Sequence, residues 1–170
     1  MTKKNNGSAP REPQVPQMKV LGQYIRDLSF ENIVTRKPVS AAIQPEFQVQ
    51  VSLDSRKVGE DDQFEVASKY SITSKNKNQD DVLFLLELEY IGLFQIKNIA
   101  GEQLHPFLMI ECPRMMFPFV RRIVSDVTRD GGFPPLNLDA IDFVTLYRER
   151  LKQHQDQAKK EAEDAETPAS

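Results

Sequence analysis

Residues 112–151 read CPRMMFPFVRRIVSDVTRDGGFPPLNLDAIDFVTLYRERL and hold two amphipathic helical patterns joined by a proline- and glycine-rich elbow. In the first pattern apolar residues recur at helical spacing, which predicts a helix that begins at Pro113 with Cys112 as its N-cap. Gly131 is expected to end this helix in a left-handed conformation. The apolar stripe of the helix comprises Met116, Phe119, Val120, Ile123, Val124 and Val127.

The second helical pattern follows an extended stretch, residues 133–138, that contains two prolines. Proline pushes the residue before it out of the helical region, so this stretch separates the two helices. Asp139 or Asp142 is expected to cap the second helix. Its apolar side comprises Phe143, Leu146, Tyr147 and Leu151.

Upstream of the helices, apolar and polar residues alternate, most cleanly at residues 47–53. Strands are expected at residues 20–31, 47–53, 64–72 and 82–94, with polar turns at 54–63 and 74–81 and a long connection at 32–45. Short polar turns between strands imply an antiparallel sheet, and helices gathered after the strands make an α+β arrangement. The predicted fold is therefore a four-stranded antiparallel sheet with two C-terminal helices packed on one face.

The length of 170 residues suits one domain. We expect this domain at residues 18–152, between a disordered N-terminal tail at 1–17 and an acidic disordered C-terminal tail at 153–170. A net charge of −3 argues against a nucleic-acid binder, and no apolar run approaches the ~18 residues of a membrane span. The single cysteine fits a reducing cytoplasm, because it has no internal partner for a disulfide.

No catalytic, metal-binding or nucleotide-binding motif is present. The two histidines, His105 and His154, are far apart in sequence, and His105 precedes a proline in an expected loop. Cys112 has no histidine nearby, and an inert buried thiol is the favoured interpretation over a reactive one. The sequence therefore predicts a protein that is not an enzyme and that uses no cofactor or metal.

Acidic residues on two of the expected strands predict a charged sheet face. The face would combine the acids Asp27, Glu31, Glu87 and Glu89 with the apolar residues Ile25, Leu83 and Leu85. One interpretation is an ordinary solvated face. The other is a docking site for a basic or zinc-bearing partner, in which charge sets rate and orientation.

Several segments in one order resemble the SecB family of protein-export chaperones. They are CPRMMFPFVRRIV, GGFPPLNL and IDFVTLYRERL, preceded by the strand-like YIRDLSFEN and FLLELEYIGLFQI. The resemblance covers residues 20–151. It implies an ATP-independent cytoplasmic chaperone that assembles as a homotetramer, a dimer of dimers. Such a chaperone holds precursor proteins unfolded and delivers them to the export motor ATPase, SecA.

The resemblance also assigns roles to residues. It implies that SecA binds the sheet surface formed by Asp27, Glu31, Leu85 and Glu87. It places the first helix between sheets at the interface of the dimer of dimers, with Met116, Phe119, Val120, Ile123 and Val127 as the contacts. From the pattern alone, the same stripe could simply cover the domain's own sheet. Met115 and Phe117 widen the apolar circumference, which favours burial on two sides.

A groove for unfolded polypeptide is the third expectation. Its lining would comprise Ile43, Phe47, Val49, Phe143 and Tyr147. A chaperone that binds many different unfolded chains needs an adaptable apolar surface rather than a shaped pocket. Each of these residues could equally be ordinary core. Familiar members of the family carry an aromatic residue where this chain has Ile43, so the preference of the groove is expected to differ.

Two other functions remain as alternatives. One is a dedicated chaperone or interaction module of the same fold with a single client, of the antitoxin-specific type. The other is a small-ligand enzyme on an α+β scaffold, for which the sequence offers no convergent polar groups.

Overall fold

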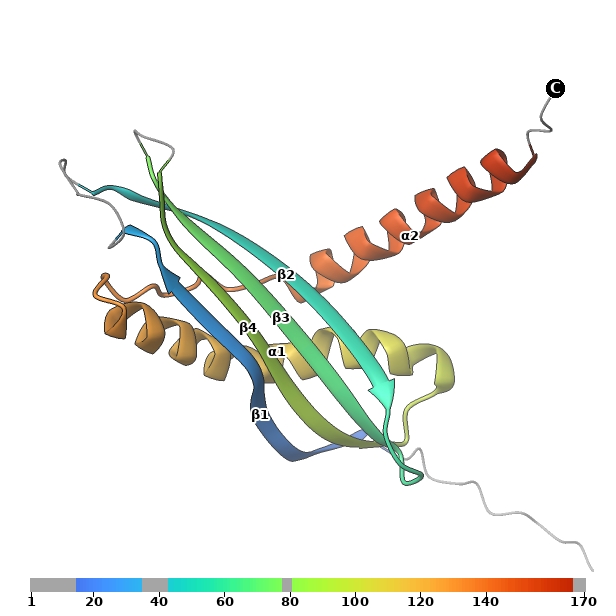
Figure 1. Ribbon diagram of the computed structural model, residues 1–170. Helices are drawn as coiled ribbons and strands as arrows, with labels where there is room; N and C mark the ends of the chain where they lie inside the picture. Colours follow the sequence, from blue (N-terminus) through green and yellow to red (C-terminus); the bar gives the residue numbers. More distant parts are fainter. Residues whose placement is uncertain (1–14, 35–42, 78–80, 167–170) are drawn as a thin grey trace, which may run out of the picture.

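The computed structural model describes residues 15–34, 43–77 and 81–166. Over these residues the chain forms four strands and two helices (Figure 1). They are β1 (Gln17–Asn32), β2 (Pro45–Lys57), β3 (Gln63–Asn76), β4 (Val82–Lys97), α1 (Gly101–Asp130) and α2 (Phe143–Glu166). Most of the expected N-terminal tail and of the connection at 32–45 lies outside the described residues.

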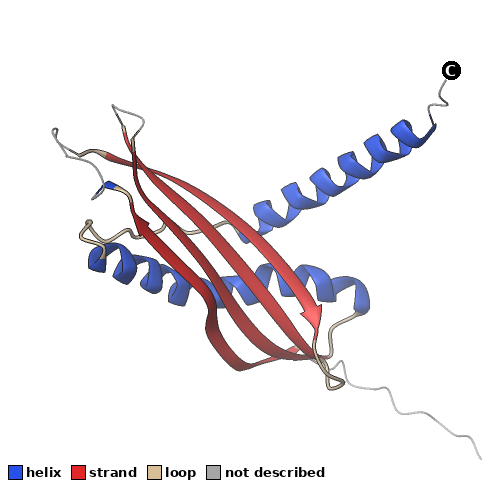
Figure 2. Ribbon diagram, in the orientation of Figure 1, coloured by secondary structure: helices blue, strands red, loops and turns tan. Residues whose placement is uncertain are grey.

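The strands make one antiparallel sheet in the order β1-β4-β3-β2 (Figure 2). Along β4 the even-numbered residues from Phe84 to Ile96 are buried under α1, because a strand turns alternate side chains to opposite faces. Val66 and Tyr70 of β3 join them in the core, as the alternation predicts. The predicted α+β fold is confirmed, and we call the face toward α1 the inner face.

The two helices relate differently to the sheet. Helix α1 lies across the inner face, whereas α2 projects away from the sheet beyond its first turns (Figure 1). The buried anchor of α2 is Phe143, which packs against Leu53 and Met109. The expected packing of both helices on the sheet thus holds in full only for α1.

Helix α1 begins earlier than the prolines suggest. It starts at Gly101, so that Pro106, Pro113 and Pro118 all lie inside it and His105 is helical rather than in a loop. A proline inside a helix removes one backbone hydrogen bond. Apolar residues on both sides of Pro113 are buried against the sheet, and this burial offsets the missing bond. Reading Pro113 as a first helical residue was therefore wrong.

Cys112 is consequently not an N-cap but a core residue of α1. Its thiol is fully buried and lies 3.8 Å from the sulfur of Met18. Burial raises the pKa of the Cys112 thiol to about 12, with a smaller contribution from the charge of Glu111. The thiol is therefore protonated and inert at neutral pH.

The end of α1 uses both glycines of the elbow, in roles other than those expected. Gly131 keeps a right-handed φ of −71°, and Gly132 takes the left-handed φ of +86°. A side chain at position 131 would place its Cβ 2.4 Å from the ring of Phe30. Gly131 is therefore required for close packing against β1, and the conformational stop lies one residue later.

Two irregularities in β1 change which side chains share a face. The register against β4 shifts between Val20 and Gly22 and again between Ile25 and Asp27. Ile25 therefore pairs with Tyr90 of the inner face, while Asp27 pairs with Glu89 of the opposite, outer face. Strict alternation put Ile25 on the acidic face, which is wrong because the bulge at Arg26 adds one residue.

Helix α2 begins at the second of the two expected caps. One carboxylate oxygen of Asp142 accepts the backbone N–H groups of Val144 and Thr145, and the other accepts the Thr145 hydroxyl. These bonds, with those from Thr145 largest, lower the pKa of Asp142. The helix then continues to Glu166, where the sequence predicted a disordered tail after residue 152.

Gly92 of β4 lies in close contact with the ring of Phe94 and with Met116 of α1. A Cβ at this position would lie 2.4 Å from the Phe94 ring and 2.9 Å from the Met116 sulfur. We expect Gly92→Ala to lower the free energy of unfolding by about 1–3 kcal/mol through overpacking. Urea denaturation measures the change. Gly22→Ala is the control, because a Cβ there meets no atom within 4 Å; equal effects of the two changes would contradict the packing argument.

Candidate functional site: two binding surfaces

The acidic face predicted from the sequence exists on the outer face of the sheet. Asp27 pairs with Glu89, and Glu31 pairs with Leu85. Residues directly opposite each other in antiparallel strands share a face, so β1 and β4 bring the four predicted partner-binding residues together. All four are exposed. We call Asp27, Glu31, Leu85 and Glu87 the acidic face.

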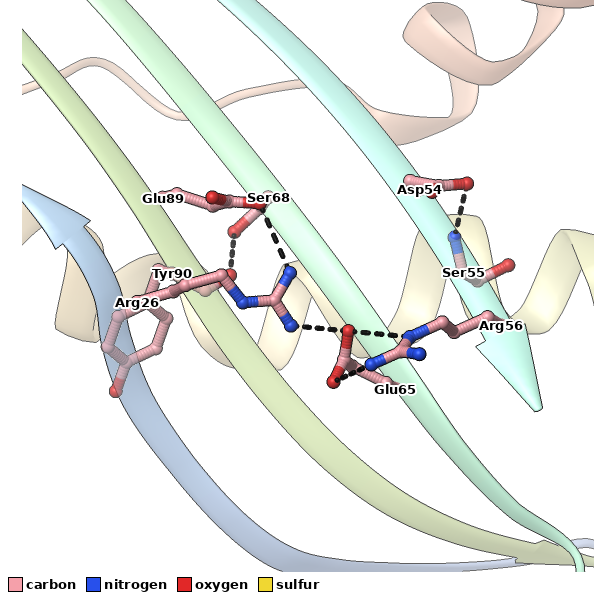
Figure 3. A network of polar contacts seen from close by, with 8 residues as sticks. All are labelled: Arg26, Asp54, Ser55, Arg56, Glu65, Ser68, Glu89 and Tyr90. Carbon is pink, nitrogen blue, oxygen red and sulfur yellow. Dashed lines mark hydrogen bonds and ion pairs between the residues drawn. The ribbon is translucent and has the colours of Figure 1, made fainter. Parts of the chain in front are cut away.

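An ion-pair network that the sequence analysis missed lies beside the acidic face. The carboxylate of Glu65 is buried and accepts Nη2 of Arg26 at 2.5 Å and Nε and Nη2 of Arg56 at 3.0 Å each. Nη1 of Arg26 also lies 3.4 Å from Glu89 (Figure 3). One residue from each strand contributes, so the network joins all four strands. Arg56 and Glu65 flank one turn and pair across it, in a register centred between Glu60 and Asp61. No local signal marks Arg26.

The network predicts an acid-sensitive contribution to stability. Hydrogen bonds from Arg56 and then Arg26 lower the pKa of Glu65 below its ordinary 4.5, although burial opposes them. A carboxylate with a lowered pKa contributes its full stabilisation at pH values above its ordinary pKa. This contribution is lost as the pH falls through the pKa of the folded state. We therefore expect the free-energy difference between wild type and Glu65→Gln to be largest near neutral pH and to shrink in acid.

Urea denaturation at several pH values tests this prediction. Glu60→Gln serves as control, because Glu60 is exposed in the turn before β3. Its effect on the free energy of unfolding should be small at every pH. A Glu65→Gln effect that is the same at acidic and neutral pH would contradict the role of the ionised carboxylate.

The second surface is an apolar strip on the edge strand β2. Phe47 and Val49 pair with Ser74 and Ile72 of β3 and therefore face the inner side, yet they are 38% and 41% exposed. Ile43, just before β2, is 39% exposed. The ring of Phe47 lies 6.2 Å from that of buried Phe84. We call Ile43, Phe47 and Val49 the apolar strip; it is apolar surface that the described residues leave partly exposed.

The two predicted groove residues of α2 do not share this exposure. Phe143 is 2% exposed and packs edge-on against Phe117 with ring centroids 6.0 Å apart. Tyr147 is half-buried, and its hydroxyl lies 3.1 Å from Nδ1 of His105. Phe143 thus anchors α2 against β2 at Val51 and Leu53, further along the strand than the strip, while Tyr147 leaves part of its ring exposed.

A hollow of about 410 Å³ opens where α1, α2 and β2 meet. Both histidines of the chain line it, although they are 49 positions apart in sequence (105 and 154). Buried Leu53 and Met109 and exposed Leu151 give it apolar lining, and its polar lining comes from Asp54, His105, Tyr147, Arg150 and His154. Arg150 donates a hydrogen bond to the backbone carbonyl of Leu53 and so fastens α2 to the edge strand.

The predicted oligomer interface on α1 is mostly core. Met116, Val120 and Ile123 are buried against the sheet, so they have no surface left for a second copy. Val127 is half-buried, and Phe119 alone of the five is well exposed, at 46%. The stripe covers the chain's own sheet, which was the other interpretation of the pattern.

Other apolar side chains of α1 and β1 are exposed instead. Phe117 packs toward Tyr70 and α2, so part of the wide apolar circumference of α1 is covered within the chain. The exposed apolar residues on the inner side of β1 and on α1 are Val20, Ile25, Leu28, Met115 and Phe119. We call these five the β1–α1 patch. Tyr24, opposite Ile91 on the outer face, and Leu21, in the first β1 bulge, are exposed as well. The strand β1 is also an edge of the sheet, with one side unpaired.

Within the described residues, no helix is long and apolar enough to cross a membrane. The same part of the chain has no group of three or more histidine, cysteine, aspartate or glutamate side chains that could hold a metal ion.

Comparison with known proteins identifies the family. The model of the family described as preprotein translocase subunit SecB matches residues 11–154. The chain belongs to the SecB family. It is 55% identical over 161 residues to the protein-export protein SecB of Ruegeria pomeroyi, covering 95% of this chain and 97% of that protein. The SecB of Roseobacter denitrificans is 60% identical over 144 residues, covering 85% and 87%.

A solved structure shares the fold of this SecB-family chain at low sequence identity. The SecB-like chaperone Rv1957 of Mycobacterium tuberculosis, in complex with a ChAD peptide from the HigA1 antitoxin, matches with a TM-score of 0.60 and 14% identity. The match covers 73% of this chain and 90% of that one. The predictions of the SecB-like fold and of a protein-export chaperone are confirmed at the level of the family.

Proposed function

We propose that this chaperone holds precursor proteins unfolded in the cytoplasm and hands them to SecA for export. The observation that carries the proposal is the coexistence of uncovered apolar surface at the apolar strip with a separate acidic face. A holding chaperone needs the first for its clients and the second for a receiving partner. Neither surface requires ATP or a metal, and we propose that the chain is not an enzyme.

The apolar strip fits an extended, unfolded chain. The side chains of Phe47 and Val49 protrude from an edge strand at alternate positions, which matches the two-residue repeat of an extended ligand. Burial of apolar area supplies affinity without reading sequence, at about 25 cal/mol per Å². Tyr147 and the hollow behind it would take larger client side chains. In this arrangement Ile43 offers the client an aliphatic contact.

A dedicated single-client chaperone is the alternative. The structural neighbour carries an antitoxin peptide, but it is only 14% identical to this chain. The relatives at 55–60% identity are named protein-export proteins. This difference favours the general export role. Competition between two unrelated unfolded precursors for one site supports the general role, whereas a single accepted client supports the alternative.

We further propose that copies of the chain associate as a homotetramer, a dimer of dimers. The β1–α1 patch, with Phe119 and Met115 on α1, would be the covered surface in place of the buried residues of the α1 stripe. Exposed large apolar residues gathered on one part of a protein are typical of interaction sites.

The acidic face is the proposed docking site for SecA. Asp27 and Glu87 are exposed and make no ion pair with any residue that the structure describes. We expect Asp27→Asn and Glu87→Gln each to slow SecA association about three- to tenfold at low salt, because exposed interface charges act mainly on the association rate. Surface plasmon resonance at two salt concentrations measures the effect.

Glu60→Gln is the matched control for this prediction, since it removes one exposed carboxylate from the turn before β3 instead. Client binding should be unchanged in all three variants. SecA association rates equal to wild type in both Asp27→Asn and Glu87→Gln would show that the acidic face is an ordinary solvated surface.

A further inference from the structure

The ion-pair network meets the acidic face at Arg26 and Glu89. Arg26 is the extra residue of the β1 bulge, immediately before Asp27. Its guanidinium bonds to Glu65 and also lies 3.4 Å from the carboxylate of Glu89. Figure 3 shows Arg26 and Arg56 reaching Glu65 from opposite sides, with Glu89 beside Arg26.

The charge of Glu89 lies close to the carboxylates of the acidic face. Glu89 lies directly opposite Asp27 across the β1–β4 ladder, and like charges in directly opposed positions repel. Glu87 stands two residues along the same strand and faces the same way. Asp27, Glu87 and Glu89 thus form a run of three carboxylates on this face. Two cations flank Glu89: Lys69 lies directly opposite it on β3, and Arg26 lies 3.4 Å away on the β1 side, next to Asp27.

We propose that Arg26 sets the charge and layout of the docking surface by holding Glu89, so that a basic partner meets Asp27 and Glu87 rather than Glu89. Arg26 is thus a positioning residue that acts through Glu89. The inference rests on the proposed function, since it presumes that the acidic face binds a basic partner. Anchoring by buried Glu65 keeps the guanidinium in place and prevents it from pairing with Asp27 instead.

Arg56 provides a matched control within the same network. It bonds to the same Glu65 from the β2 side with no bond to Glu89. Arg26→Gln and Arg56→Gln therefore each remove one positive charge and one partner of Glu65. Only Arg26→Gln releases Glu89 beside the acidic face.

The test uses the full chain and a synthetic peptide of repeated lysine and glycine, with association rates measured by stopped-flow fluorescence at low and high salt. We expect Arg26→Gln to raise the association rate about three- to tenfold at low salt and to steepen its salt dependence. Arg56→Gln should stay within about twofold of wild type. Arg26→Gln/Glu89→Gln should return to the wild-type rate, and Arg26→Lys should retain it. These four results together support the assignment.

Glu89→Gln alone keeps the proposal falsifiable if Arg26→Gln does not fold. Because Arg26 already pairs with Glu89, the association rate of the peptide with Glu89→Gln should differ less than about twofold from that with wild type. The association rate with Asp27→Asn should be lower than with wild type. A loss in Glu89→Gln equal to that in Asp27→Asn would overturn the role of Arg26. Equal association rates for Arg26→Gln and Arg56→Gln, with a lowered rate for Asp27→Asn, would also overturn the role of Arg26. If Asp27→Asn binds the peptide as wild type does, the proposed function of the face fails, and this inference with it.

Discussion

Phe47→Ser/Val49→Ser will weaken the binding of an unfolded precursor at least tenfold. Both side chains are partly exposed on β2 and belong to the apolar strip. Covering the exposed part of each by a client is worth roughly 1–2 kcal/mol at ~25 cal/mol per Å², and 1.4 kcal/mol is tenfold in Kd. Fluorescence anisotropy with a labelled, denatured precursor measures the loss.

The control for this change lies on the same strand. Gln48 and Gln50 alternate with the strip and face the outer side, so Gln48→Ser/Gln50→Ser changes β2 equally without touching the strip. We expect its client affinity to stay within about twofold of wild type. Equal losses in the two double variants would indicate that β2 is merely disturbed and that the strip is not the client site.

The second large effect is expected at Phe143, the buried anchor of α2. Phe143→Ala removes a ring that packs against Leu53, Met109 and Phe117, and large-to-small changes of this kind cost about 3–5 kcal/mol. Because the rest of α2 projects away from the sheet, the loss should release α2 before the sheet unfolds.

Hydrogen exchange followed by mass spectrometry distinguishes these events. In Phe143→Ala, amides of α2 should exchange faster while those of β3 and β4 remain protected. Tyr147→Phe is the control, since it removes only the hydroxyl contact to His105. Uniformly faster exchange across the sheet would show that α2 belongs to the same cooperative unit as the core.

The sheet was predictable because its alternation is strong. In residues 47–53 and 82–94 every second residue is apolar, and these residues face α1 in the structure. The acidic face was predictable for the same reason, because Asp27 and Glu31 lie on the C-terminal side of the bulge, where the alternation of β1 still holds. Ile25 was misplaced because bulges leave no clear mark in a single sequence.

The start of α1 and the length of α2 were not predictable from local signals. Pro106 and Pro113 argue against a helix over the first twelve residues of α1, and tertiary burial around Leu108 and Cys112 offsets the cost of these prolines. The segment after Leu151 is too polar to pack, so composition alone predicted disorder where the structure has helix. The contact of Arg26 with Glu65 joins residues 39 positions apart and needs the strand order to be known.

Native mass spectrometry with and without an unfolded secretory precursor tests the central claim most directly, since it reports subunit number and client binding together. We expect a tetramer that gains the mass of the unfolded precursor and ignores the same protein once folded. A monomer whose mass is unchanged by the unfolded precursor would contradict the account, because the apolar strip and the β1–α1 patch would then have no occupant.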